Sequence, residues 1–192
     1  MPEVTDAFRT TYPEIALDVQ LTDTLIDVIA EDCDLAIRVS APPTDKSTIW
    51  RKIRRVPLVV VAAPELFLNG LPENPDDIDP ALAMSYSTDV EAELWVFSRG
   101  SATRTLRAGQ NLSSNNGDLL HAMAVSGQGV CVLPDLLVAD ALADGSLIRL
   151  LPDWTLPALW LTLYYPPYEK LPPLVATFSD FFENFITKKM SS

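Results

Sequence analysis

The stretch Cys33-Asp34-Leu35-Ala36-Ile37-Arg38-Val39 is the part of the chain that decides the fold. An apolar run of this length with one charge near each end is typical of a strand buried on both faces. The preceding segment, Thr22 to Glu31, has the apolar spacing of a helix, and Ile15 to Leu21 alternates like a half-exposed strand. Strand, helix and strand in this order predict a parallel crossover unit. Such units place ligands at the carboxyl ends of their strands, which points to Ser40.

The composition is that of a globular protein and restricts its partners. The chain has 192 residues, of which 48% are hydrophobic and 21% charged, enough for one domain or two small lobes. The net charge of -12 argues against direct binding of nucleic acid, because phosphate contacts need clustered Lys and Arg. The one dense basic run, Arg51 to Arg55, leads into an apolar strand, so a solvated sheet edge is favoured over a phosphate-binding patch. No secretory signal or membrane span is recognised, which predicts a cytoplasmic, soluble protein.

Two α/β modules follow one another along the chain, and a last strand and helix come after both. The strand Leu159 to Tyr165 and the aromatic helix that follows it begin after the second module is complete. If this helix packs on the first module, the chain crosses between two lobes twice. We therefore expect an α/β fold with residues 1–85 plus 158–192 in lobe one and 86–157 in lobe two, and a ligand cleft between them.

The residues that most often carry catalysis are sparse. The only histidine, His121, has no acidic or thiol partner nearby in the sequence, so a helix-surface or satisfied side chain is favoured over a catalytic base. Cys33 and Cys131 lie in apolar runs, which favours buried, inert thiols over a redox pair. Gly127-Gln128-Gly129 lacks a third glycine and follows a helix, so it is no phosphate loop. We expect no catalytic residue, no metal site and no cofactor.

Polar residues before two predicted helices form a better constellation. Ser113-Ser114-Asn115-Asn116 precede a helix predicted from Asp118 to Ser126, where free N–H groups and the helix dipole favour an anion. Thr22-Asp23 occupy the same position before the crossover helix. Ordinary helix capping explains such side chains in most proteins, so capping and ligand binding both stay open here.

At these residues the sequence resembles the effector-binding domain of LysR-type transcriptional regulators. Each matching piece is short, but six of them in the same order are specific. They are Tyr12-Pro13-Glu14-Ile15 with Leu17-Asp18, Asp27 to Glu31, Asp34 to Arg38, Val60 to Pro64, Asn115 to Asp118, and Gly127 to Val130 with Leu133-Pro134 and Val138-Ala139.

The resemblance implies a two-lobed fold like that of type II periplasmic binding proteins, with two hinge crossings. It also implies a small effector, often a carboxylate, in the cleft, and a cytoplasmic transcription factor that assembles as dimers and tetramers. The effector contacts of the family fall on Thr22, Ser40, Ser87, Ser114, Asn115, Asn116, Gly129 and Val130.

The sequence departs from the family pattern at its start. The helix-turn-helix and its linker helix are absent, so the resemblance implies that DNA is bound only through an N-terminal domain outside this chain. The first strand of lobe one is also missing, which we expect to weaken effector binding or to require a strand borrowed from a neighbour.

The function favoured by the sequence is that of an effector-sensing, non-enzymatic domain that binds a small anionic metabolite. The first alternative is a solute-binding protein of the same fold, which would need a secretory signal. The second is an enzyme that uses His121 with an acidic partner, for which the sequence offers no second catalytic group.

Overall fold

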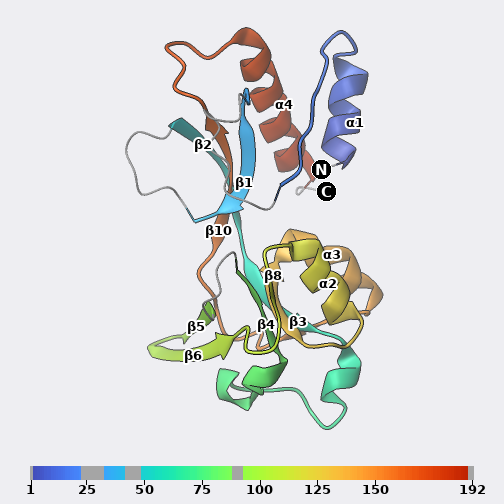
Figure 1. The fold of residues 1–192 in the computed structure, drawn as a ribbon, viewed down its shortest axis with the longest axis vertical. Helices are drawn as coiled ribbons and strands as arrows, with labels where there is room; N and C mark the ends of the chain where they lie inside the picture. Colours follow the sequence, from blue (N-terminus) through green and yellow to red (C-terminus); the bar gives the residue numbers. More distant parts are fainter. Residues whose placement is uncertain (1, 23–32, 42–48, 88–92, 190–192) are drawn as a thin grey trace. The chain divides into compact units, whose positions relative to one another are not determined.

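The computed structural model describes residues 2–22, 33–41, 49–87 and 93–189, and the chain forms two compact units (Figure 1). Unit 1 comprises residues 1–54 and 160–192, and unit 2 comprises residues 55–159. The division differs from the expected lobe boundary at residue 85, since residues 55–85 belong to unit 2. They do so because their strands pair with later strands of that unit. The crossover helix expected over Thr22 to Glu31 lies almost wholly outside the described residues.

Unit 1 combines a small antiparallel sheet with two helices. Its elements are α1 (Pro2–Thr11), β1 (Ala36–Ser40), β2 (Ile49–Val56), β10 (Leu159–Tyr165) and α4 (Pro173–Lys189). The strand order is β1-β10-β2, so β10 is central, and its last five residues are buried. Helices α1 and α4 lie side by side (Figure 1). Their contact is aromatic: the Phe8 ring lies 5.0 Å from that of Phe178 and 5.2 Å from that of Phe181.

Two expectations for unit 1 are wrong. β1 is a half-buried edge strand paired antiparallel to β10, from Ala36 opposite Tyr164 to Ser40 opposite Trp160, and is no doubly covered parallel strand. The predicted strand Ile15 to Leu21 does not form, and the side chain of Leu21 is 84% exposed. Apolar alternation allows an extended backbone, but a strand forms only when a neighbouring backbone completes its hydrogen bonds.

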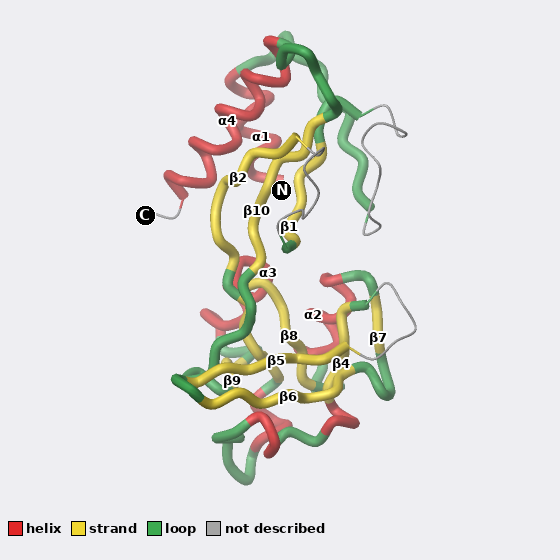
Figure 2. Tube along the Cα trace, turned by 90° about the vertical axis from the view of Figure 1, so that its left-hand side faces the viewer, coloured by secondary structure: helices red, strands yellow, loops and turns green. Residues whose placement is uncertain are grey.

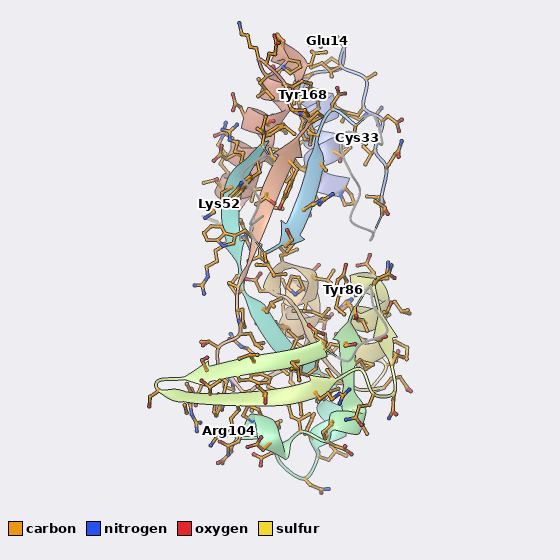
Figure 3. The ribbon with its side chains drawn as sticks, turned by 60° about the vertical axis from the view of Figure 1, so that its left-hand side comes forward. Glu14, Cys33, Lys52, Tyr86, Arg104 and Tyr168 are labelled. Atoms are coloured by element: carbon orange, nitrogen blue, oxygen red, sulfur yellow. The ribbon has the colours of Figure 1, made fainter. Side chains whose placement is uncertain are left out.

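The basic run forms a solvated edge of the sheet, as expected. It lies on β2, an edge strand of the three-stranded sheet. The Arg51 guanidinium donates to Asp180 at 2.7 Å and also to Glu183, both on α4. Lys52, labelled in Figure 3, also lies on β2. Its Nζ is 3.9 Å from the centroid of the Trp160 ring. The hydrogen bond to Asp180 is the largest cause of the raised pKa of Arg51. Arg51 and Lys52 therefore have their interaction partners within unit 1.

Unit 2 contains a mixed five-stranded sheet of order β7-β4-β8-β3-β9 and a separate β5–β6 hairpin, which crosses the strands of the sheet (Figure 2). β8 is parallel to β4 and antiparallel to β3. The strands and helices are β3 (Leu58–Ala62), β4 (Ala83–Tyr86), β5 (Glu93–Arg99), β6 (Ala102–Ala108), β7 (Ser113–Ser114), α2 (Gly117–Val125), β8 (Val130–Pro134), α3 (Asp135–Asp144) and β9 (Ile148–Leu150). Three short 3-10 helices join β3 to β4: η1 (Pro64–Phe67), η2 (Pro75–Asp77) and η3 (Pro80–Leu82).

The central strands of unit 2 are buried on both faces, and alternate residues enter two different cores. Val130 and Val132 pack with Trp95 and Phe97 of the hairpin. Cys131 and its neighbours on the other face pack with the apolar side of α2 and α3, including Leu120. The sheet is therefore covered by helices on one face and by the hairpin on the other.

The helices of unit 2 lie close to where the sequence predicts them. α3 ends at Gly145, whose φ of 80° is the left-handed conformation that glycine adopts without strain. The sequence also predicts a helix that is capped by Asp135 and closed by Gly145. Asp135 is instead the first helical residue of α3, and the cap position is Pro134. None of the described helices is long and apolar enough to cross a membrane.

Candidate functional site

Helix α2 begins at the carboxyl end of β4. The two-residue strand β7 runs parallel to β4, with Ser113 opposite Ser85 and Ser114 opposite Tyr86. The backbone N–H of Ser87 donates to the Ser114 carbonyl at 3.0 Å, which continues this pairing beyond β4. Figure 3 labels Tyr86 at this end of the strand. The pairing brings Ser87 and Ser114, both predicted effector contacts, to one end of the sheet.

Asn116 and Ser114 build the start of α2. The Asn116 side-chain oxygen accepts from the Leu119 backbone N–H at 2.7 Å, and the Asn116 N–H donates to Ser114 Oγ at 3.0 Å. Each side chain thus uses an acceptor to hold the first turn in place. These two predicted site residues have a structural task as helix caps.

Asn115 differs from its neighbours because it has no such task. Its side chain is exposed, and no hydrogen bond is recorded for it with the described residues. The amide of Asn115 can therefore donate to or accept from a bound molecule without disturbing α2. We call Tyr86, Ser87, Ser114, Asn115 and Asn116 the cap surface.

A carboxylate that the sequence reasoning missed borders the cap surface. Glu93 is the first residue of β5, and its Oε2 accepts from the Tyr86 backbone N–H and from the Trp95 indole N–H, each at 3.1 Å. Burial raises the pKa of Glu93, while the two hydrogen bonds lower it. The only signal in the sequence is a carboxylate two residues before a tryptophan on the same side of a strand, which is too common to single out.

Gly129 and Val130, also predicted as effector contacts, lie at the other end of α2. Val130 is opposite Ala83, the first residue of β4, and is fully buried. A Cβ on Gly129 would lie 2.4 Å from the Leu82 carbonyl oxygen. A nine-residue helix is about 13 Å long, so these two residues are well separated from the cap surface. Their position indicates a role in close packing.

Thr22 and Ser40 belong to unit 1. Thr22 is exposed and lies outside the described strands and helices. Ser40 ends β1, and its hydroxyl donates to the Ala41 carbonyl at 3.1 Å and lies 3.4 Å from the Tyr164 hydroxyl. Ser40 is thus at a strand end, as predicted, but its hydroxyl is engaged within unit 1.

His121 is half-buried on α2, and its Nε2 is buried without a hydrogen-bond partner among the described residues. Its charge is the last of the causes that lower the pKa of Asp144, behind the hydrogen bonds from Ser146. The proximity of His121 and Asp144 was invisible in the sequence because 23 positions separate them. Ser146, which donates to Asp144 through its backbone N–H and its hydroxyl, already binds that carboxylate.

The prediction of buried thiols is confirmed for one cysteine. Cys131 is fully buried, and burial followed by the charge of Glu93 raises its pKa to about 12. Such a thiol stays protonated and inert at neutral pH. Cys33, by contrast, is only half-buried.

Among the described residues, no three His, Cys, Asp or Glu side chains gather as metal ligands. A surface hollow of about 420 Å³ lies in unit 2, lined by Phe67, Gly70 to Asn74 and Asp77. It includes none of the predicted site residues. Its lining comes from one continuous segment that runs from η1 to η2 and contains no group of side chains that points to specific chemistry.

Comparison with known proteins gives a consistent picture. Residues 1–186 match the family model described as LysR substrate binding domain. The chain is 31% identical over 166 residues to an uncharacterized HTH-type transcriptional regulator of Haemophilus influenzae, covering 86% of this chain and 57% of that protein. It is 30% identical over 177 residues to the HTH-type transcriptional regulator PtxR of Pseudomonas aeruginosa, covering 91% of this chain and 56% of that protein.

Solved structures share the fold. The regulatory domain of an AphB variant from Vibrio vulnificus is 27% identical, with a TM-score of 0.74 over 93% of this chain and 89% of that domain. The regulatory domain of CrgA, a LysR-type transcriptional regulator from Neisseria meningitidis, is 20% identical, with a TM-score of 0.80 over 95% of this chain and 90% of that domain. The two-lobed, periplasmic-binding-protein-like α/β fold follows from these matches.

The chain spans somewhat more than half the length of the curated relatives it matches. The match itself covers nearly the whole chain. The chain therefore belongs to the LysR substrate-binding domain family.

Proposed function

We propose that this chain senses a small-molecule effector for a LysR-type transcriptional regulator, and that a separate part of a longer protein binds DNA. The observation that carries the proposal is the family match over residues 1–186. Relatives that are named HTH-type transcriptional regulators support it. The net charge of -12 is also consistent with DNA binding elsewhere.

Within the chain, the cap surface of unit 2 is the proposed contact for an anionic group of the effector. The first turn of α2 presents backbone N–H groups and the positive end of the helix dipole, both of which favour negative charge. Asn116 already accepts from one of these N–H groups, at Leu119. The exposed amide of Asn115 adds a donor for which the described residues provide no acceptor. Thr22 and Ser40 stay predicted contacts from unit 1, and the proposal does not depend on them.

Asn115→Ala tests this role directly. Small mono- and dicarboxylates are titrated into the natural and the variant protein, and binding is measured by calorimetry. For any compound that binds, we expect Asn115→Ala to lower the affinity about tenfold, because a hydrogen bond to a charged group contributes about 1.5–3 kcal/mol. Asn69→Ala is the matched control, since Asn69 is an exposed asparagine outside the cap surface. An unchanged affinity in a folded Asn115→Ala protein would show that this surface does not bind the anion.

The coupling to transcription needs a second experiment. Residues 1–192 replace the matching part of PtxR, and the expression of a reporter gene is measured with and without a ligand that binds the isolated chain. We expect the ligand to change expression, and we propose that the chimera self-associates as a dimer or a larger assembly, measurable by sedimentation. A ligand that binds tightly yet leaves expression unchanged would contradict the sensing role.

The other functions considered from the sequence are not favoured. The relatives are named as transcriptional regulators, and none of these names describes a transport protein or an enzyme. The surroundings of His121 add no support for catalysis, because the nearby Asp144 carboxylate is already held by Ser146.

A further inference from the structure

Glu93 is a half-buried carboxylate whose charge the described residues do not neutralise. None of the ion pairs in the described part of the chain includes it. The causes that shift its pKa are burial and its two hydrogen bonds, and no cation contributes. Partial burial of an unpaired charge is unfavourable, and such groups occur most often where a protein uses them for binding or chemistry.

The fold does not require this charge. Both donors, the Tyr86 N–H and the Trp95 indole N–H, bind the same oxygen atom, Oε2. The side-chain oxygen of a glutamine could accept both bonds without bringing a charge out of water. The two hydrogen bonds therefore explain why an acceptor stands here, but they do not explain why it is charged.

The second oxygen of Glu93 is available to a ligand. Among the described residues, no group donates a hydrogen bond to Oε1. The side-chain oxygens and nitrogens that are buried there without a hydrogen bond do not include Oε1, so Oε1 is not buried and can reach solvent. The carboxylate contacts the cap surface at the Tyr86 backbone N–H, whose nitrogen lies 3.1 Å from Oε2. The N–H groups of Ser85 and Ser87 point toward the β7 side of β4, so the N–H of Tyr86 points to the opposite edge, and Glu93 and Ser114 lie on the two sides of the end of β4. The start of β5 lies beside β4 in Figure 2.

We propose that Glu93 binds a protonated nitrogen of the effector, so that the ligand class is a small zwitterion with an ammonium group and a carboxylate. The inference rests on the proposed function, which supplies the contact for the carboxylate at the cap surface. A simple anion would meet the negative charge of Glu93 without compensation. An ammonium group forms a charge-assisted hydrogen bond there, and the desolvated surroundings of the carboxylate strengthen this attraction.

Matched ligand pairs test the inference. The probes are the natural L-α-amino acids and, for each, the 2-hydroxy acid of the same skeleton, which keeps the carboxylate and replaces the ammonium with a hydroxyl. Binding is measured by thermal shift and then by calorimetry at pH 7. We expect at least one amino acid to bind the protein at least tenfold more tightly than its hydroxy acid, and Glu93→Gln to abolish that preference while the hydroxy acid binds at least as tightly as before.

Asp118→Asn is the matched control, because Asp118 is an exposed carboxylate in the first turn of α2 and undergoes the same change from acid to amide. Loss of the preference in Asp118→Asn but not in Glu93→Gln would overturn the inference. Tight binding of hydroxy acids without preference for the amine, with sensitivity to Asn115→Ala, would overturn it and leave the proposed function standing. Absence of binding by either series, with binding of another carboxylate that is sensitive to Asn115→Ala, would likewise overturn the inference alone.

Discussion

The two ends of α2 were predicted to contact the same ligand, yet they differ in every physical property that matters for binding. The N-terminal end carries the exposed Asn115 and, across β4, the carboxylate of Glu93, which forms no ion pair with the described residues. The C-terminal end leads into Gly129 and Val130, which are buried against the start of β4. The comparison shows that one sequence motif can combine an end with exposed polar groups, where we propose binding, and an end that is buried in close packing.

The largest expected effect is at the packing end. Gly129→Ala would place its Cβ 2.4 Å from the Leu82 carbonyl oxygen, a backbone atom that cannot move without disturbing the start of β4. We expect the free energy of unfolding to fall by about 2 kcal/mol or more, as for other overpacked cores. Urea denaturation measures the change.

Gly117→Ala is the control for this prediction. Its Cβ would lie 3.2 Å from Leu137 Cδ2, the end of a flexible side chain, so the neighbour can yield. We expect a loss of less than about 0.5 kcal/mol, the usual range for a substitution without a specific clash. Equal losses for the two variants would mean that Gly129 has no special packing role.

A smaller effect on stability distinguishes Asn115 from Asn116 at the N-terminal end of α2. Asn116→Ala removes the acceptor for the Leu119 N–H. We therefore expect the free energy of unfolding to fall by about 1 kcal/mol. Asn116→Ser retains a capping oxygen and should recover most of this loss. Asn115→Ala should leave the unfolding free energy unchanged, because no hydrogen bond of its side chain is recorded among the described residues. Thermal or urea unfolding of the three variants makes the comparison, and a destabilised Asn115→Ala would assign that residue to the fold.

The smallest effect concerns the pH dependence of stability at Glu93. Burial raises the pKa of this carboxyl above its unfolded value, so its protonation favours the folded state. The stabilisation is complete below the ordinary glutamate pKa and is lost as the pH rises through the raised folded value. Glu93→Gln removes this titration, so its stability relative to the natural protein should rise with pH across that interval. Because Glu93 is partly solvated, we expect a difference of only a few tenths of a kcal/mol.

Urea unfolding of both proteins at pH 4 and pH 7 measures this difference. Glu93→Ala serves as the control, because it removes both hydrogen bonds and should be less stable than Glu93→Gln at both pH values. The opposite result would be an unfolding free energy that rises from pH 4 to pH 7 in the natural protein relative to Glu93→Gln. It would contradict the prediction and show that a cation compensates the charge of Glu93.

Much of unit 2 could be predicted from the sequence because its signals are local. Gly145 stops α3 through a backbone conformation that glycine adopts without strain, and the Ser-Asn run begins α2 through hydrogen bonds that span a few residues. The run from Val130 to Pro134 is apolar throughout because both of its faces are covered. The order of the matching pieces along the chain was sufficient to indicate the family.

Tertiary structure alone decided the features that depend on distant partners. Cys33 to Val39 has the apolar composition of a central strand, but β1 is an edge strand because, among the described residues, only β10 pairs with it. Ile15 to Leu21 alternates like a strand yet forms none. Glu93 and Tyr86 are bound to each other through a backbone N–H that no pattern marks. Local sequence determines which conformations a segment can adopt, whereas strand pairing, burial and the compensation of a charge depend on what the rest of the chain places beside it.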